Sequence, residues 1–169
     1  IDLHAAPGGQ GYNADISDYD SSKFSLWESV ANQDKTVELW KRLSQRYKNE
    51  EWVAGYDLIN EPNWNLPGNK LVKELYVRIT DVIRAEGDEH ILFIEGNWFA
   101  NGLTGLVPPW DDNMVYSPHK YCSPVDEEYL DWLIQDTLTT PIFVGESAEN
   151  STLWYRAAIK LYEDHKIGC

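Results

Sequence analysis

Apolar residues recur along the chain with two alternating periods, which predict helices and strands in turn. Helical spacing predicts amphipathic helices over 34–48, 71–83, 126–136 and 151–165. Short, mostly apolar runs predict strands over 52–60, 91–95, 113–118 and 141–146, and residues 1–4 read as the end of another buried strand. Gly87 stands where a glycine is expected to end the second of these helices.

This alternation predicts parallel strands joined by crossover helices, because hairpins would show two-residue turns instead. We expect an α/β fold, specifically an incomplete (β/α)8 TIM barrel. A complete barrel spends about 31 residues on each strand–helix unit, so the 169 residues hold about five units. A doubly wound sheet would alternate similarly, but no phosphate-binding Gly-x-Gly-x-x-Gly precedes a helix, and Gly8, Gly9 and Gly11 read as a flexible turn.

Composition narrows the class of partner. Apolar residues make up 43% of the chain, with 8 Trp and 10 Tyr, which excludes a disordered protein. The 28 acidic residues against 14 basic ones would repel nucleic acid. No apolar stretch approaches the roughly 18 residues that span a bilayer, so we expect no membrane partner. Cys122 and Cys169 are too few for a disulfide framework or a four-ligand zinc site, so we expect thiols and no metal.

Two glutamates carry the candidate chemistry, because each ends an apolar run: Glu61 after Tyr-Asp-Leu-Ile-Asn and Glu146 after Ile-Phe-Val-Gly. Parallel strands place their carboxyl ends on one rim, so the two carboxyl groups can meet across a barrel. A carboxyl pair is what cleavage of a glycosidic bond requires, one group protonating the leaving oxygen and the other attacking the anomeric carbon. Asn60, beside Glu61, could hydrogen-bond a sugar 2-hydroxyl.

Other polar and aromatic residues follow the same strand ends. A hydroxyl of Tyr121 donating to a carboxylate would keep it ionised, and His119 lies at the same strand end. His4 ends the first strand, with a satisfied core histidine as the alternative. Tryptophans in these loops could stack on pyranose rings or simply pack beneath a loop: Trp64, Trp98, Trp110 and Trp27. The helix-stripe residues Trp40 and Trp154 are interpreted as core.

Four segments resemble, in order, the third, fourth, sixth and seventh strands of glycoside hydrolase family 5, the barrel family of cellulases, mannanases and exo-1,3-glucanases. They are Asp-Leu-His at 2–4, Leu-Ile-Asn-Glu-Pro at 58–62, Ser-Pro-His-Lys-Tyr at 117–121 and Val-Gly-Glu at 144–146. The resemblance implies Glu61 as acid/base, Glu146 as nucleophile, Asn60 as partner of the 2-hydroxyl and Tyr121 as partner of the nucleophile. It also implies that His4 and His119 bind substrate.

The resemblance runs from the third strand to the helix after the seventh, so residues 1–169 are interpreted as part of a catalytic domain. The family's second-strand arginine and eighth-strand tryptophan have no counterpart here. An open barrel leaves sheet edges unpaired, so we expect poor solubility or self-association of the isolated chain. No basic segment followed by an apolar stretch opens the chain, and we expect the full-length parent protein to be secreted or periplasmic.

We therefore expect a retaining glycosidase, an endo-β-1,4-glucanase, which acts on a β-glucan polysaccharide or oligosaccharide without a cofactor. Residues 2–10 also resemble the exo-1,3-glucanase branch, so exo-β-1,3-glucanase or mannanase activity is the nearest alternative. A non-catalytic carbohydrate-binding protein is an alternative of another class. A serine hydrolase using Ser147 is disfavoured, because Gly-Glu-Ser-Ala lacks the second glycine of a nucleophile elbow. The sequence leaves the oligomeric state open.

Overall fold

The computed structural model of the chain describes residues 1–130, 140–147 and 150–169. Its helices are α1 (Ala14–Ser17), α2 (Val30–Tyr47), α3 (Lys70–Ala85) and α5 (Thr152–Asp164), with a 3-10 turn η1 at Pro67–Asn69. Its strands are β1 (Gly55–Asp57), β2 (Ile91–Ile94), β3 (Met114–Tyr116), β4 (His119–Lys120) and β5 (Glu146–Ser147). Of the helix predicted over 126–136, residues 127–130 are helical and 131–136 lie outside the described residues.

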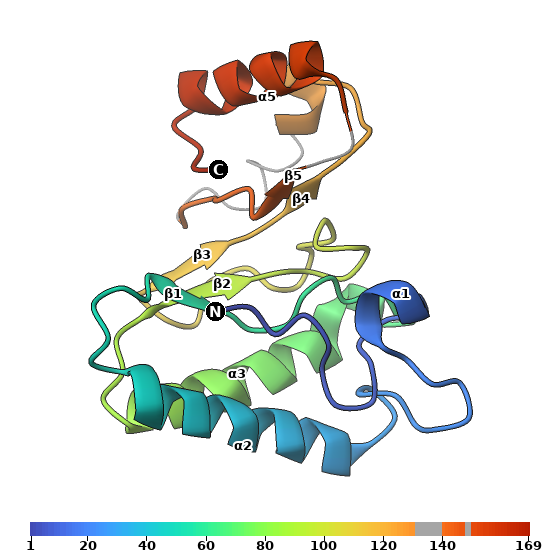
Figure 1. Cartoon of the computed structure of the whole chain (residues 1–169), viewed down its shortest axis with the longest axis vertical. Helices are drawn as coiled ribbons and strands as arrows, with labels where there is room; N and C mark the ends of the chain where they lie inside the picture. Colours follow the sequence, from blue (N-terminus) through green and yellow to red (C-terminus); the bar gives the residue numbers. More distant parts are fainter. Residues whose placement is uncertain (131–139, 148–149) are drawn as a thin grey trace.

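Neighbouring strands follow one another in chain order, and all of them are parallel. β1, β2 and β3 form one sheet and β4 and β5 another. Single parallel bridges extend the series of labelled strands (Figure 1) at both ends. They join Asp2 to Asp57 and Tyr116 to Ile142. Such sequential order is that of an arc of a barrel, whereas a doubly wound sheet reverses its strand order. The prediction of parallel strands is confirmed. Helix α3 joins β1 to β2 as predicted, whereas residues 95–113, between β2 and β3, contain no helix.

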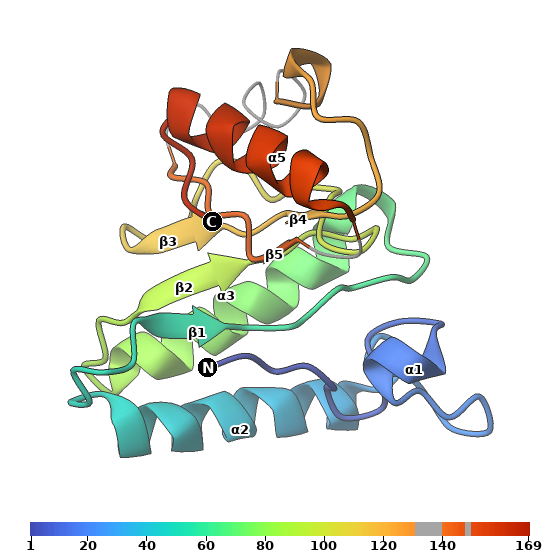
Figure 2. The same ribbon diagram turned by 45° about the horizontal axis from the view of Figure 1, so that its top comes forward.

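The helices are set by their caps and apolar stripes. The Ser29 side chain accepts the Asn32 amide hydrogen and starts α2 at Val30, earlier than residue 34, where the apolar pattern predicted it. Helix α3 buries one face, and Gly87 follows its last turn with φ 73°, as predicted for a helix-ending glycine. The two helices pack side by side along β1 and β2, while α5 lies beside β4 and β5 (Figures 1 and 2).

Most strands are shorter than their apolar runs predicted. Over 52–60 only Gly55–Asp57 is strand, because residues 50–53 form an exposed turn closed by a hydrogen bond from the Val53 amide to the Glu50 carbonyl. The expected first strand, residues 1–4, is reduced to the bridge at Asp2. Late in the chain, the Gly168 carbonyl accepts from the Val144 amide, so a further parallel pairing follows α5.

The main core lies between α2, α3 and the sheet. Trp40 is fully buried, donates its indole N–H to the Leu58 carbonyl and packs 5.3 Å from the Tyr56 ring, which confirms its interpretation as core. Trp154 is only partly buried, against a smaller cluster under α5. Cys122 and Cys169 are both exposed. None of the helices in the described ranges is long and apolar enough to cross a membrane.

Candidate active site

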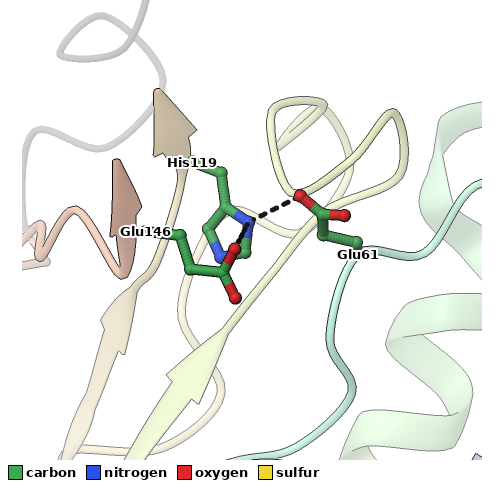
Figure 3. A group of neighbouring side chains, drawn as sticks. All are labelled: Glu61, His119 and Glu146. Carbon is green, nitrogen blue, oxygen red and sulfur yellow. Dashed lines mark hydrogen bonds and ion pairs between the residues drawn. The ribbon is translucent and has the colours of Figure 1, made fainter. Parts of the chain in front are cut away.

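Four ionisable side chains gather where successive strands end or begin. Glu61 follows β1, Glu95 follows β2, His119 starts β4 and Glu146 starts β5, directly paired with His119 in register. One donor atom from each of Glu61, His119 and Glu146 lies within 4.8 Å of the other two. Figure 3 shows the two glutamates converging on the imidazole. The structure therefore brings the two glutamates singled out in the sequence to one place.

His119 lies beneath the glutamates, with only 2% of its surface exposed. Its Nδ1 is 2.8 Å from Glu61 Oε1 and 3.5 Å from Glu146 Oε2, and its Nε2 is 3.1 Å from Glu95 Oε1. Burial opposes a charge on the ring, but the hydrogen bonds to Glu61 and Glu95 and the surrounding negative charges outweigh it and raise the pKa of His119 to about 10. Both ring nitrogens have carboxylate partners in this structure. That His119 also binds substrate, as the family resemblance implies, stays a prediction.

Glu95 is a site residue that the sequence analysis missed. Its side chain is 1% exposed; Oε1 contacts His119, and Oε2 accepts the backbone N–H of Glu61 at 2.6 Å. The signal was present, because Glu95 ends the apolar run Ile-Leu-Phe-Ile in the way that Glu61 and Glu146 end theirs. The strand-end criterion would have selected it if it had been applied to every strand.

Tyr121 and Asn60 flank the two glutamates. The Tyr121 hydroxyl donates to Glu146 Oε2 at 2.6 Å, which is the contact the sequence suggested. Asn60 is buried, and its side-chain nitrogen has no hydrogen-bond partner within the described ranges. This amide N–H is therefore available to donate a hydrogen bond to a ligand. Gly145 leaves room for the arrangement, because a Cβ there would collide with Ser117 Oγ and lie 3.5 Å from His119 Nε2.

A cavity of about 480 Å³ opens above the glutamates. Its lining comes from His4, Asp15, Ile16, Glu61, Phe99, Asn101, Tyr121 and Glu146. The His4 side chain is 59% exposed and hydrogen-bonds Asp2 at 2.9 Å, so its alternative interpretation as a core histidine is wrong. The side chain of Glu146 is 33% exposed, which leaves this carboxylate accessible from the cavity.

A second hollow, of about 660 Å³, is lined by Trp64 and Trp98 among others. Trp98 is 69% exposed and offers a free indole surface. One face of Trp64 is covered by Tyr12, whose ring stacks on it at 3.8 Å. Trp27 is buried and donates to the Gln10 carbonyl, so the suggestion that it stacks on sugar is wrong. Trp110 is partly buried against the main core and donates to Thr80, which is the packing role given as its alternative.

Glu61, His119 and Glu146 could be considered as metal ligands because their donor atoms lie so close together. A histidine binds a metal through its neutral imidazole, and metal binding must displace any proton on the ligating nitrogen. A His119 whose pKa is raised to about 10 keeps both ring protons at neutral pH. In this structure both ring nitrogens of His119 lie within hydrogen-bond distance of carboxylates, which is the arrangement of an ion pair between carboxylates and an imidazolium.

Comparison with known proteins gives this geometry a family context. Residues 1–164 match the model of one protein family, described as Cellulase (glycosyl hydrolase family 5). A β-xylosidase of Phanerodontia chrysosporium is 36% identical over 124 residues, which are 72% of this chain and 25% of that protein. Endoglucanase C of Acetivibrio thermocellus is 29% identical over 129 residues, 72% of this chain and 33% of that protein. The chain thus spans a quarter to a third of these relatives.

Solved structures show the same fold. Endoglucanase Cel5A of Thermotoga maritima superposes with a TM-score of 0.70 at 21% identity, covering 85% of this chain and 59% of that one. The β-glucanase SdGluc5_26A of Saccharophagus degradans gives a TM-score of 0.68 at 19% identity, covering 99% of this chain and 55% of that one. The Thermotoga enzyme has also been solved with mannotriose and with cellobiose. The described strands and helices are therefore part of a TIM barrel.

Proposed function

Because the chain belongs to glycosyl hydrolase family 5, we propose that its protein is a retaining glycosidase that cleaves β-linked glucan chains, with Glu61 and Glu146 as the reacting carboxyl groups. The observation that carries this proposal is the approach of a Glu61 oxygen and a Glu146 oxygen to within 4.8 Å beside an open cavity. Retaining glycosidases hold their carboxyl pair at roughly 5–5.5 Å, whereas inverting ones leave room for a water molecule between the groups.

We assign the role of nucleophile to Glu146 and the role of acid/base to Glu61. Glu146 Oε2 accepts the Tyr121 hydroxyl hydrogen at 2.6 Å, which orients this carboxyl group for attack. In the first step a Glu146 oxygen bonds the anomeric carbon, the glycosidic C–O bond breaks, and the leaving oxygen takes a proton from Glu61. In the second step water attacks the anomeric carbon, its proton passes to Glu61, and the ester bond breaks to restore the Glu146 carboxylate.

The substrate that we propose is a β-1,4-glucan cut at internal bonds. Trp98, whose exposed indole lines the second hollow, is the chain neighbour of Phe99, which lines the cavity at the glutamates. This aromatic surface supports binding of a chain rather than of a terminal residue. The endoglucanase relative supports cleavage of a glucan at internal bonds. If the protein instead cleaves β-1,3-glucan, mannan or a β-xyloside, that compound replaces β-1,4-glucan as its substrate. Since a polymeric glucan lies outside the cell, we also propose a secreted or periplasmic protein, which cell fractionation tests.

Azide rescue tests the roles of the two glutamates in the full-length protein. With an activated aryl β-glucoside, Glu146→Ala should regain turnover with azide and release an α-glycosyl azide, because azide replaces the missing nucleophile. Glu61→Ala should release a β-glycosyl azide, because azide then attacks the glycosyl enzyme. Glu163→Ala, an exposed change on α5, is the matched control and should behave like the wild type. The reverse anomers would exchange the two roles.

Product analysis on cellulose, mixed-linkage glucan, laminarin and mannan tests the substrate. Release of oligosaccharides from internal β-1,4 bonds is the expected result. A protein that binds these glucans without cutting any of them would be a non-catalytic carbohydrate-binding protein, and the proposal would be wrong.

A further inference from the structure

A second carboxyl pair, Asp57 and Glu95, lies behind the reacting glutamates and takes no part in the steps above. Asp57 ends β1, and Glu95 directly follows β2, the strand beside it. Their side chains are hydrogen-bonded to each other. Two carboxyl groups can share such a bond only if one of them keeps its proton. The question is which one carries the charge.

The surroundings of the two groups assign that proton. Burial raises the pKa of Asp57 well above its usual value, and the negative charges of Glu95 and Asp2 raise it further. Burial raises the pKa of Glu95 above its usual value as well, but hydrogen bonds from His119, from the Glu61 amide and from Asp57 reduce that rise, and no such set of donors among the described residues acts on Asp57. Asp57 is therefore the proton donor of the pair and Glu95 the carboxylate.

Glu95 thus collects three donors on its two oxygens: the Asp57 hydroxyl, His119 Nε2–H and the Glu61 backbone N–H. The last of these matters because Glu61 has φ 44°, in the left-handed region that a side chain disfavours. A 2.6 Å bond from the Glu61 amide to a buried carboxylate stabilises that conformation. Tyr76 helps to hold the Glu95 backbone in place, because its hydroxyl donates to the Glu95 backbone carbonyl at 2.9 Å.

We propose that Glu95 is a positioning residue of the glycosidase: as a carboxylate held by the protonated Asp57, it keeps His119 doubly protonated between Glu61 and Glu146 and fixes the backbone of Glu61. This inference rests on the proposed function for its catalytic meaning. The imidazolium faces Glu61, Glu95 and Glu146. Its positive charge permits Glu61 and Glu146, which Figure 3 shows beside the ring, to lie so close together.

Two isosteric amides separate the members of the pair. Asp57→Asn still presents an N–H donor to Glu95, so it imitates the protonated aspartate. Glu95→Gln can accept the Glu61 amide hydrogen only by turning its own NH2 group toward His119 Nε2, which must then give up its proton. A residue needed only for packing would tolerate both changes equally, because both preserve shape.

The measurements are the His119 titration, followed by NMR of the labelled imidazole, and the steady-state kinetics on a soluble glucan. For Glu95→Gln we expect the pKa of His119 to fall by about one unit or more and kcat to fall about ten-fold or more, with KM changed less than about two-fold. For Asp57→Asn we expect both quantities to stay close to wild type. Equal losses in the two variants, or an unchanged His119 titration in Glu95→Gln, would overturn the proposal.

The wild-type protein provides a test that does not require any variant to fold. Its His119 should carry protons on both ring nitrogens at pH 8, and a neutral ring there would overturn the proposed role of Glu95. This readout is independent of turnover, so it distinguishes the two proposals. If wild-type protein cuts no glucan, the proposed function fails, while the spectrum still decides the protonation of His119.

Discussion

Replacing Tyr121 with phenylalanine should slow the reaction without weakening substrate binding. The change removes the hydroxyl that donates to Glu146 Oε2 at 2.6 Å and leaves the ring in place. A hydrogen bond to a charged group contributes about 1.5–3 kcal/mol. The side chain of Glu146 is 33% exposed, so water can replace part of the lost bond and the lower end of that range applies. At about 1.4 kcal/mol for each factor of ten, kcat should fall about 10- to 30-fold.

Tyr155→Phe is the matched control, because the Tyr155 hydroxyl donates to the neutral carbonyl of Ser147, one residue from Glu146, at 3.2 Å. We expect it to change kcat less than about five-fold, since a hydrogen bond to a neutral group contributes about 1 kcal/mol and this one acts on Glu146 only through its neighbour. Initial rates on a soluble glucan measure both variants. A Tyr121→Phe protein with wild-type kcat, or one whose loss lies entirely in KM, would show that this hydroxyl does not act on the nucleophile.

Three further outcomes follow from contacts in the structure. Because the pKa of His119 is raised to about 10, its contribution to stability is complete below pH 6.5 and is lost as the pH rises toward 10. Urea unfolding at pH 6, 8 and 10 should therefore give a free energy of unfolding that falls with pH. A free energy that stays constant over this range would contradict an imidazolium at His119. Trp98→Ala should raise KM for a polymer several-fold and change stability by less than about 0.5 kcal/mol, and unaltered KM would remove this indole from the binding surface. Trp40→Ala should lower the free energy of unfolding by about 3–5 kcal/mol, because it leaves a cavity at a fully buried position and removes the hydrogen bond to the Leu58 carbonyl. Urea denaturation measures this change, and a loss below about 1 kcal/mol would refute this account of the core.

Periodicity could predict the layers of the fold because burial acts on repeating positions. The stripe of α3 and the glycine after it are read directly from residue spacing. Strand ends were harder to locate, since a strand needs a hydrogen-bonded neighbour as well as apolar residues. The run over 52–60 is apolar, yet only Gly55–Asp57 pairs with β2. The alternating pattern therefore specified which elements exist, and the pairing determined where each strand begins and ends.

The candidate site was predictable to the extent that it lies at strand ends. Glu61 and Glu146 could be paired from sequence because parallel strands share one rim, and Tyr121 could be linked to Glu146 only through the family resemblance. The position of His119 between three carboxylates was not predictable, because no local pattern tells which way a ring turns at the start of a strand. The suggestion for Trp27 was wrong for a related reason: this residue occurs in a polar loop, but its N–H group has a partner inside the protein.

The order of the strands explains why the proposed acid/base and nucleophile depend on two intermediaries. Within each sheet the strands pair in chain order, β1 with β2, β2 with β3, and β4 with β5, so groups at their ends meet their neighbours in the same order. Glu61 is held through its amide by Glu95, Glu95 contacts His119, and His119 contacts Glu146. The reacting glutamates therefore lie at strands that are not adjacent. The two groups between them, Glu95 and His119, must carry opposite charges because they contact each other. A carboxylate at Glu95 and a cation at His119 satisfy that requirement, whereas reversing either charge would leave like charges in contact at the centre of the site.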